Sequence, residues 1–244
     1  MLNLKKLIRV SYYIKLVIYM FYRGFYCNKF FGTHISFKKF FSKRSYKIVG
    51  FSRIRNEELI IEDTLNHMSN FVDAILIYDD DSTDNTIKEV VKNKKVVEVL
   101  INKFWKKDRP LEETMNRQEL LNASRKYNPN YLFCFDADER FEGNIREFLL
   151  NEGKKMDFDS IRIRLFDAYI TKNDKKSIRK KDKVYNFRKY FGPEYRDIIM
   201  IWRNLENISF QGDIAREPTG TKKNIIKFRC QHYGKSLSIE QWEE

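Results

Sequence analysis

Short apolar runs alternate with segments of helical periodicity over the middle of the chain. Four runs have the length and composition of strands buried on both faces of a parallel sheet. They lie at 47–53, 72–78, 96–101 and 131–135. Apolar residues recur at helical spacing between them, at 57–68, 85–91 and 110–127. This alternation predicts a doubly wound, mostly parallel α/β sheet with right-handed crossovers, beginning at Tyr46.

Details of these helices follow from local chemistry. Asn56 and Asp84 are expected to cap the first two helices, because Asn and Asp are favoured N-cap residues. His67 lies near the end of the first helix and is interpreted as structural. The third helix is expected to turn four residues inward, namely Leu111, Met115, Leu121 and Ser124.

The pattern loosens after residue 138. A helix is predicted at 145–150 and mixed or antiparallel strands at 160–166, 184–190, 198–202 and 225–230. The lysine-rich stretch 174–183 is consistent with a solvated hairpin tip. The second half of the chain is therefore expected to extend the sheet in mixed orientation.

The first 31 residues are apolar, aromatic and basic. The longest uncharged run, 16–22, is shorter than the roughly 20 residues of a membrane span. No small-residue cleavage site follows it, so a signal peptide is not indicated. On a helix, one side would be apolar and the other basic, although Leu16 and Met20 fall on the basic side. The apolar side would hold Leu7, Ile14, Ile18, Phe21 and Phe25, and the basic side Lys5, Arg9 and Arg23.

Two interpretations of this segment remain open. The helix can lie at a membrane surface with its aromatic rings at headgroup level, or it can pack on its own domain or on a partner. Residues 32–46 are interpreted as a basic connector. The chain is thus divided into a basic aromatic segment at 1–45 and a folded domain at 46–244.

The positive charge is concentrated in the N-terminal part of the chain. The net charge is +13, and residues 1–56 hold thirteen Lys or Arg and no acid. The rest of the chain is neutral, with 34 acidic residues balanced by the remaining basic ones. This asymmetry indicates an anionic membrane surface or a polyanion as a partner of the N-terminal segment.

Cysteine usage indicates a reducing compartment. Cys27, Cys134 and Cys230 are far apart and form no Cys-x-x-Cys pair. Neither a zinc site nor a disulfide framework is therefore expected. A cytoplasmic location fits this pattern.

Acidic and amide side chains follow three of the predicted strands. Asn56 and Glu57 follow the first, Asp79-Asp80-Asp81 the second, and Asp136 with Asp138 the fourth. Parallel strands end at one edge of a sheet, where such sheets bind ligands. Clustered carboxylates repel each other unless a cation compensates, and Mg²⁺ is often held by one or two carboxylates plus phosphate oxygens. Asp-x-Asp alone also fits a solvated turn, but three clusters at one edge favour a site.

Four motifs occur in order between residues 47 and 141. They are Arg55-Asn56-Glu57-Glu58, DDDSTDNT at 79–86, Asn116-Arg117-Gln118 and Phe135-Asp136-Ala137-Asp138-Glu139. Their order and content resemble the family 2 glycosyltransferases, the large GT-A group of nucleotide-sugar enzymes. One position of the second motif, usually Gly in that family, is Asp81 here. Arg216-Glu217-Pro218 and His232-Tyr233-Gly234 are similar to the bacterial subgroup with a DxDE motif.

The resemblance implies roles on the nucleotide side. Asp80 would accept a hydrogen bond from the base, with uracil N3 expected as the donor. Asn56 and Glu57 would line the nucleoside pocket. Arg117 would contact the nucleotide, and Asp136 would approach the ribose or the metal.

The resemblance also implies a metal site. Asp138 would ligate Mn²⁺ or Mg²⁺ bridging the diphosphate, with Asp136 beside it and His232 completing the coordination. A lone His at a strand end is equally consistent with a structural role. A metal would stabilise the negative charge that the diphosphate acquires when the sugar leaves.

An inverting transfer needs a carboxylate to take the proton of the acceptor hydroxyl. In the family this base lies C-terminal to the Asp-x-Asp motif. Glu217 is the first candidate here, and Asp213 and Glu194 are alternatives. Glu217 would otherwise be a surface acid paired with Arg216.

The sequence therefore predicts a GT-A transferase acting on a nucleotide sugar, expected to be UDP-linked. The acceptor would be a glycan or lipid-linked molecule of the bacterial cell envelope, reached from the inner face of the cytoplasmic membrane. The stereochemistry, expected to be inverting, is taken from the family.

Two alternatives belong to other classes. A haloacid-dehalogenase-like phosphotransferase also places Asp-x-Asp after a strand, but its motif normally opens the domain and its usual Thr or Val is Arg140 here. A non-enzymatic polyanion or membrane-surface binder would explain the charge. Nucleic acid is not expected as a partner, because the folded body is neutral rather than basic.

Overall fold

The computed structural model describes residues 4–31, 34–102, 110–212, 216–234 and 236–237. Five helices are α1 (Leu4–Tyr22), α2 (Ile61–Met68), α3 (Thr86–Val90), α4 (Pro110–Arg125) and α5 (Ile145–Leu150). The strands before residue 103 are β1 (Phe25–Phe31), β2 (His34–Lys39), β3 (Ile48–Ile54), β4 (Ala74–Asp80) and β5 (Val96–Asn102). The later strands are β6 (Tyr131–Cys134), β7 (Glu139–Glu142), β8 (Ser160–Tyr169), β9 (Tyr190–Arg203) and β10 (Asn224–His232).

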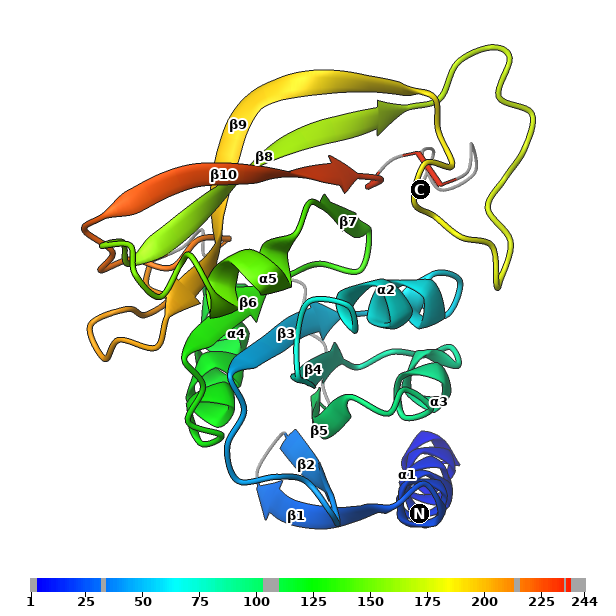
Figure 1. Ribbon diagram of the computed structural model, residues 1–244. Helices are drawn as coiled ribbons and strands as arrows, with labels where there is room; N and C mark the ends of the chain where they lie inside the picture. The colour runs from blue at the N-terminus through cyan, green and yellow to red at the C-terminus, as the bar shows by residue number, and fades with distance from the viewer. Residues whose placement is uncertain (1–3, 32–33, 103–109, 213–215, 235, 238–244) are drawn as a thin grey trace.

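The ten strands form one sheet in the order β1-β2-β5-β4-β3-β6-β9-β8-β10-β7 (Figure 1). Strands β5, β4, β3 and β6 are parallel neighbours, which confirms the predicted strand–helix alternation. Their carboxyl ends therefore meet at one edge of the sheet. The register places Ile54 beside Asp79 and Asp80 beside Asn102, so the polar motifs begin at this edge.

Apolar clusters cover both faces of the parallel strands. On one face, Leu120 and Leu121 of α4 pack with Phe51 of β3. On the other, α2 contributes Ile61 and Leu65, and α3 and α5 pack alongside. Figure 1 shows α4 on one side of these strands and α2 and α3 on the other. Strands buried on both faces explain the continuous apolar runs in the sequence.

The second half of the chain continues the sheet in mixed orientation. Strand β9 pairs antiparallel with β6 and β8, and β10 runs parallel to β8 and antiparallel to β7. The sequence did not predict β7. The predicted strand at 184–190 is wrong, because regular pairing begins only at Tyr190. The Val184 N–H instead donates to Oδ2 of Asp63 at 3.0 Å, which ties this segment to α2.

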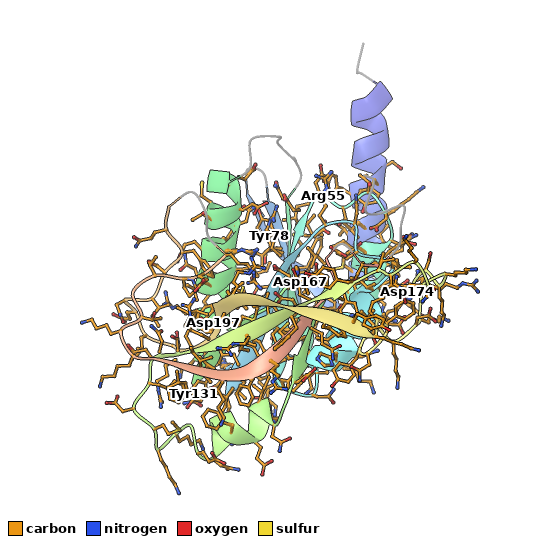
Figure 2. All side chains as sticks on the ribbon, turned by 90° about the horizontal axis from the view of Figure 1, so that it is seen from above. Arg55, Tyr78, Tyr131, Asp167, Asp174 and Asp197 are labelled. Carbon is orange, nitrogen blue, oxygen red and sulfur yellow. The ribbon has the colours of Figure 1, made fainter. Side chains whose placement is uncertain are left out.

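The N-terminal segment packs on the domain. Strands β1 and β2 form a hairpin, and β2 pairs antiparallel with β5. The prediction that residues 32–46 form a connector is therefore wrong in part, because β2 lies within them and is a strand of the sheet. Leu16 and Met20 of α1 belong to the main core. Figure 2 shows the N-terminal turns of α1 extending beyond the other elements. Among the described residues, no helix is long and apolar enough to cross a membrane.

Three expectations about the helices are corrected. The N-cap of α3 is Asn85, with no side-chain cap, so Asp84 is not its N-cap. Helix α2 begins at Ile61 with no side-chain cap, so Asn56 is not its N-cap. Asn56 adopts a φ of 53° and bonds to a neighbouring loop instead. Met115 of α4, expected inside, is 63% exposed, because the inner face of that helix carries Asn116 and Arg117 toward the sheet edge.

Candidate functional site

The loops after β3 and β4 are joined to each other at the carboxyl edge of the sheet. The side-chain oxygen of Asn56 accepts the Thr83 N–H at 2.8 Å, and the Asn56 N–H donates to Ser82 Oγ at 2.9 Å. The Glu57 N–H donates to Thr86 Oγ1 at 2.7 Å. Asn56 therefore holds the two loops in register, a role that sequence reasoning did not assign to it.

Buried carboxylates lie at the end of β4. Asp80 is buried, with one oxygen 2.6 Å from a guanidinium nitrogen of Arg53 and the other 3.0 Å from Nδ2 of Asn102. Asp79 is also buried, and burial raises its pKa to about 7. Arg53 thus compensates the charge of Asp80, and partial protonation reduces the charge of Asp79.

Glu57 faces the other acids of the edge. Burial raises its pKa to about 8, and the charges of Asp138 and Asp136 add to the effect. At neutral pH the carboxyl group is therefore mostly protonated and can donate a hydrogen bond. This arrangement suits a ligand that presents acceptor oxygens or a cation to the edge.

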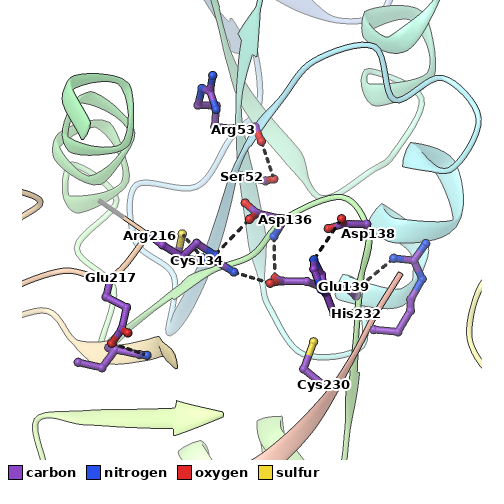
Figure 3. A network of polar contacts seen from close by, with 12 residues as sticks. Ser52, Arg53, Cys134, Asp136, Asp138, Glu139, Arg216, Glu217, Cys230 and His232 are labelled. Carbon is purple, nitrogen blue, oxygen red and sulfur yellow. Dashed lines mark hydrogen bonds and ion pairs between the residues drawn. The ribbon is translucent and has the colours of Figure 1, made fainter. Parts of the chain in front are cut away.

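Arg216 holds the first carboxylate of the Asp-x-Asp motif. Its Nε lies 3.2 Å from Oδ2 of Asp136, and its Nη2 binds Oε1 of Glu139 (Figure 3). The Asp136 N–H in turn donates to Oε2 of Glu139 at 2.8 Å. Burial opposes the charge on Asp136, but Arg216 and Arg117 lower its pKa. Asp136 is therefore an ionised, internally paired carboxylate.

Arg117 brings a second guanidinium to the same edge from α4. It is buried, and its Nη2 lies 3.5 Å from Oδ1 of Asp136. Its Nε and Nη1 have no hydrogen-bond partner within the part of the chain that the structure describes. A buried cation with unused donors is suited to an anionic ligand.

His232 lies between two carboxylates, one on each side of its ring. Its Nε2 is 3.4 Å from Oδ2 of Asp138, and its Nδ1 is 2.7 Å from Oδ1 of Asp167. Burial works against protonation, but Asp138 and Asp167 raise the pKa of His232 to about 10. In the ligand-free protein the imidazolium ring thus compensates the charge of Asp138.

The predicted metal ligands are only partly brought together. Asp138 and His232 face each other, whereas Asp136 is turned to Arg216 and Arg117. Arg216 and Arg117 hold Asp136 in the ligand-free protein, and its convergence with Asp138 on one ion stays a prediction. Among the residues that are described, no three His, Cys, Asp or Glu side chains form a ready metal cluster.

Gly234, which has no side chain, lies beside the Asp138–His232 pair. A Cβ placed on Gly234 would lie 3.2 Å from Nε2 of His232 and 3.4 Å from Oδ2 of Asp138. The glycine therefore keeps this pair accessible on one side, as a site for an ion or a phosphate requires.

Glu217 is the candidate base whose side chain the structure describes. Glu217 accepts the Ile199 N–H at 3.1 Å and forms an ion pair with Arg162 at 2.8 Å, so its carboxylate is engaged within the fold. Glu194 lies in β9, and Asp213 lies outside the described residues.

His67, expected to be structural, accepts the Phe141 N–H at Nε2, 2.8 Å away.

Sequence reasoning missed several residues that bind the acids or His232 at this edge. They are Arg53, Asn102, Glu139 and Asp167, together with the bridging role of Arg216. Arg53 and Asn102 had a local signal, because each lies at the end of a predicted parallel strand. Asp167 had none, since its contact with His232 depends on the pairing of β8 with β10.

Comparisons with solved structures agree with this architecture. S. aureus TarS superposes on 80% of this chain with a TM-score of 0.52 at 13% sequence identity. TarS 1-349 in complex with UDP-GlcNAc covers 81% with a TM-score of 0.51 at 14% identity. The fold is of the GT-A type. No protein-family model and no curated protein matches the sequence.

The GT-A fold of this chain corresponds to part of the TarS structures. The matched region makes up 38% of the TarS chain and 64% of the TarS 1-349 chain. At these identities the likeness concerns the fold alone.

Proposed function

We propose that this protein transfers a sugar from a nucleotide-linked donor, expected to be UDP-linked, to a glycan or lipid-linked acceptor. The observation that carries the proposal is the pairing of Asp138 with His232 at the carboxyl edge of a GT-A sheet. Asp80, Glu57 and Arg117 are buried or half-buried at the same edge. The UDP-GlcNAc complex of TarS, which shares the fold, supports a nucleotide sugar as the donor.

Asp138 and His232 would hold a divalent ion, Mn²⁺ or Mg²⁺. The residues fit such an ion: Nε2 of His232 already faces Asp138, Asp167 fixes the other ring nitrogen, and Gly234 leaves room beside them. Two protein ligands leave coordination positions for diphosphate oxygens. When bound, the ion would stabilise negative charge on the departing diphosphate. His232 must lose its extra proton to act as a ligand, so metal binding would release a proton.

The remaining residues of the edge bind and orient the donor. The unused donors of Arg117 are suited to a phosphate oxygen, and the protonated carboxyl of Glu57 can donate to a ribose or phosphate oxygen. Asp80, which lies at the end of β4, would accept a hydrogen bond from the base. Asp136 would act mainly through its fixed charge, since Arg216 already holds it.

Glu217 remains the proposed base for an inverting transfer, with Asp213 as the alternative. In the ligand-free protein Glu217 is held by its ion pair with Arg162 at 2.8 Å. Proton transfer would therefore be favoured if the acceptor displaces Arg162 from one carboxylate oxygen.

We further propose that residues 1–45 associate with an anionic membrane and that residues 46–244 form the transferase domain. The absence of acids in the first 56 residues supports the membrane association. An acceptor of the cell envelope carried on a lipid would be met at the inner face of the cytoplasmic membrane.

The test is a thermal-shift titration with UDP, GDP and CMP, each with and without Mn²⁺. Stabilisation by one nucleotide that requires Mn²⁺, and that is lost in Asp138→Asn, would support the proposal. Asp157→Asn is the matched control, because Asp157 is an exposed acid paired only with Lys223 among the described side chains. If no nucleotide shifts the melting of the folded protein, the transferase proposal is wrong.

A further inference from the structure

Helix α1 is anchored on the domain through one narrow side. Leu16 and Met20 are buried in the main core, and Tyr13 and Tyr19 pack against it. The Tyr19 hydroxyl also donates to the Lys88 carbonyl of α3 at 3.3 Å. This anchoring side is the one that the helical periodicity assigned to the basic face. The helix is thus fixed to the domain without using its apolar stripe.

The opposite side of α1 exposes that apolar stripe. Ile14, Ile18 and Phe21 are 56%, 64% and 66% exposed, and their spacing of four and three residues places them on one side of the helix. Val17 and Tyr22 are exposed beside them. A helix that is already packed on its domain gains nothing from these side chains within the fold.

The turn after β2 extends this surface. Phe41 is 98% exposed, and Phe40 is exposed next to it. The ring centroids of Phe21 and Phe40 are 5.6 Å apart, and those of Tyr26 and Phe40 are 5.3 Å apart. We call this surface the aromatic face and define it by Ile14, Ile18, Phe21, Phe40 and Phe41. Contiguous exposed apolar patches mark interaction sites.

The charge around the aromatic face selects the occupant. Lys15, Lys43 and Arg44 are exposed near it in the sequence, and the first acid of the chain is Glu57. A second copy of the chain would bring two such basic segments together, which is unfavourable. An anionic lipid surface instead offers an apolar layer for the rings and negative charge for the basic residues, at about 1 kcal/mol per basic residue.

We propose that the aromatic face inserts into the interfacial layer of an anionic bilayer. This deepens the membrane association proposed above and assigns it to a rigid surface rather than to a loose N-terminal tail. Because α1 packs on α3 and β2 pairs with β5, the bilayer would fix the orientation of the whole sheet. The carboxyl edge would then keep a constant position relative to a lipid-borne acceptor.

The experiment is co-sedimentation of the full chain with vesicles of phosphatidylglycerol and phosphatidylcholine, compared with phosphatidylcholine alone. The variant Ile18→Ser/Phe21→Ser/Phe41→Ser is expected to lose about tenfold or more in vesicle affinity. Met156→Ser is the control, because Met156 is an exposed apolar residue outside the face. Nucleotide binding, followed by thermal shift with UDP and Mn²⁺, should be the same in all three proteins.

Vesicle binding tests the membrane inference independently of the transferase proposal, which UDP binding tests. Anionic-vesicle binding that the triple variant loses and Met156→Ser retains supports it, whether or not UDP binds. Equal binding of wild type and triple variant, or no binding of wild type, overturns it. A wild-type dimer that the triple variant converts to monomer would also overturn it, because the face would then be covered by a second copy.

Discussion

Nδ1 of His232 lies 2.7 Å from Oδ1 of Asp167, on the side of the ring away from Asp138. Asp167 comes from β8 and His232 from the neighbouring β10, so the contact is built into the sheet. A carboxylate that binds Nδ1 leaves Nε2 as the ligating nitrogen and fixes the ring plane. Asp167 is therefore a positioning residue for the proposed metal site.

Replacing Asp167 by Asn should weaken Mn²⁺ binding in the presence of UDP by about 10- to 100-fold, because the ring loses its orienting carboxylate. Isothermal calorimetry or the Mn²⁺ paramagnetic resonance signal measures this directly. Asp157→Asn, on an exposed acid, serves as the control and should leave the affinity unchanged. Equal affinities for the Asp167 variant and wild type would mean that Asp167 has only a structural role.

Arg216→Met should lower the free energy of unfolding by about 3–5 kcal/mol, because it leaves Asp136 and Glu139 as charges without their guanidinium at a buried position. Chemical denaturation measures the change. Lys223→Met removes an exposed ion pair and should change stability by no more than about 1 kcal/mol. The double variant Arg216→Met/Glu139→Gln should recover part of the loss, and no recovery would contradict the ion-pair explanation.

Asp81→Gly should stabilise the protein by about 1 kcal/mol. Asp81 has a φ of 58°, a left-handed conformation that glycine adopts without strain. A left-handed backbone at this position also explains why the family 2 glycosyltransferases, which the motif resembles, usually have glycine at it. Thermal or chemical denaturation reports the gain, and Asp81→Ala, which keeps a Cβ in the strained backbone, should give no stabilisation.

The free energy of unfolding should fall as the pH falls from about 6.5 to about 4. Burial, with the nearby charge of Arg140, lowers the pKa of His67 to about 4. In that window the unfolded chain binds a proton at His67 that the folded protein does not, so acid favours unfolding. His67→Gln, whose amide oxygen can still accept the Phe141 N–H, should flatten this part of the pH–stability curve. An unchanged slope would assign the acid sensitivity to other groups.

Local patterns predicted the parallel half of the fold. The apolar runs at 47–53, 72–78 and 131–135 mark strands β3, β4 and β6, because strands buried on both faces leave an uninterrupted signal in the sequence. The polar residues that follow them were therefore placed at the correct edge. The start of α2 was predicted incorrectly. Asn56 has the residue type of a helix cap, but its hydrogen bonds to the loop after β4 decide its conformation.

Contacts between distant strands were not predictable from local patterns. Whether Asp136 meets a metal or Arg216 depends on where the segment after β9 returns to the sheet. The segment from Val184 to Tyr190 alternates like a strand but bonds to α2 and to side chains of β10. On α1, the periodicity placed Ile14, Ile18 and Phe21 on one side, and these three are exposed, but Phe25, predicted on the same side, lies in β1 and is buried. Leu16 and Met20, outside the predicted stripe, are the residues that the domain buries.

The ladder between β7 and β10 has a consequence for the order of assembly. The Tyr233 N–H donates to the carbonyl of Asp138 at 2.9 Å, and Gln231 bonds to Glu142 across 89 positions of the chain. Asp138 emerges from the ribosome long before His232 does. During synthesis the nascent acidic edge thus lacks its histidine until nearly a hundred further residues have been added, so donor recognition would be acquired only after that stretch has been made.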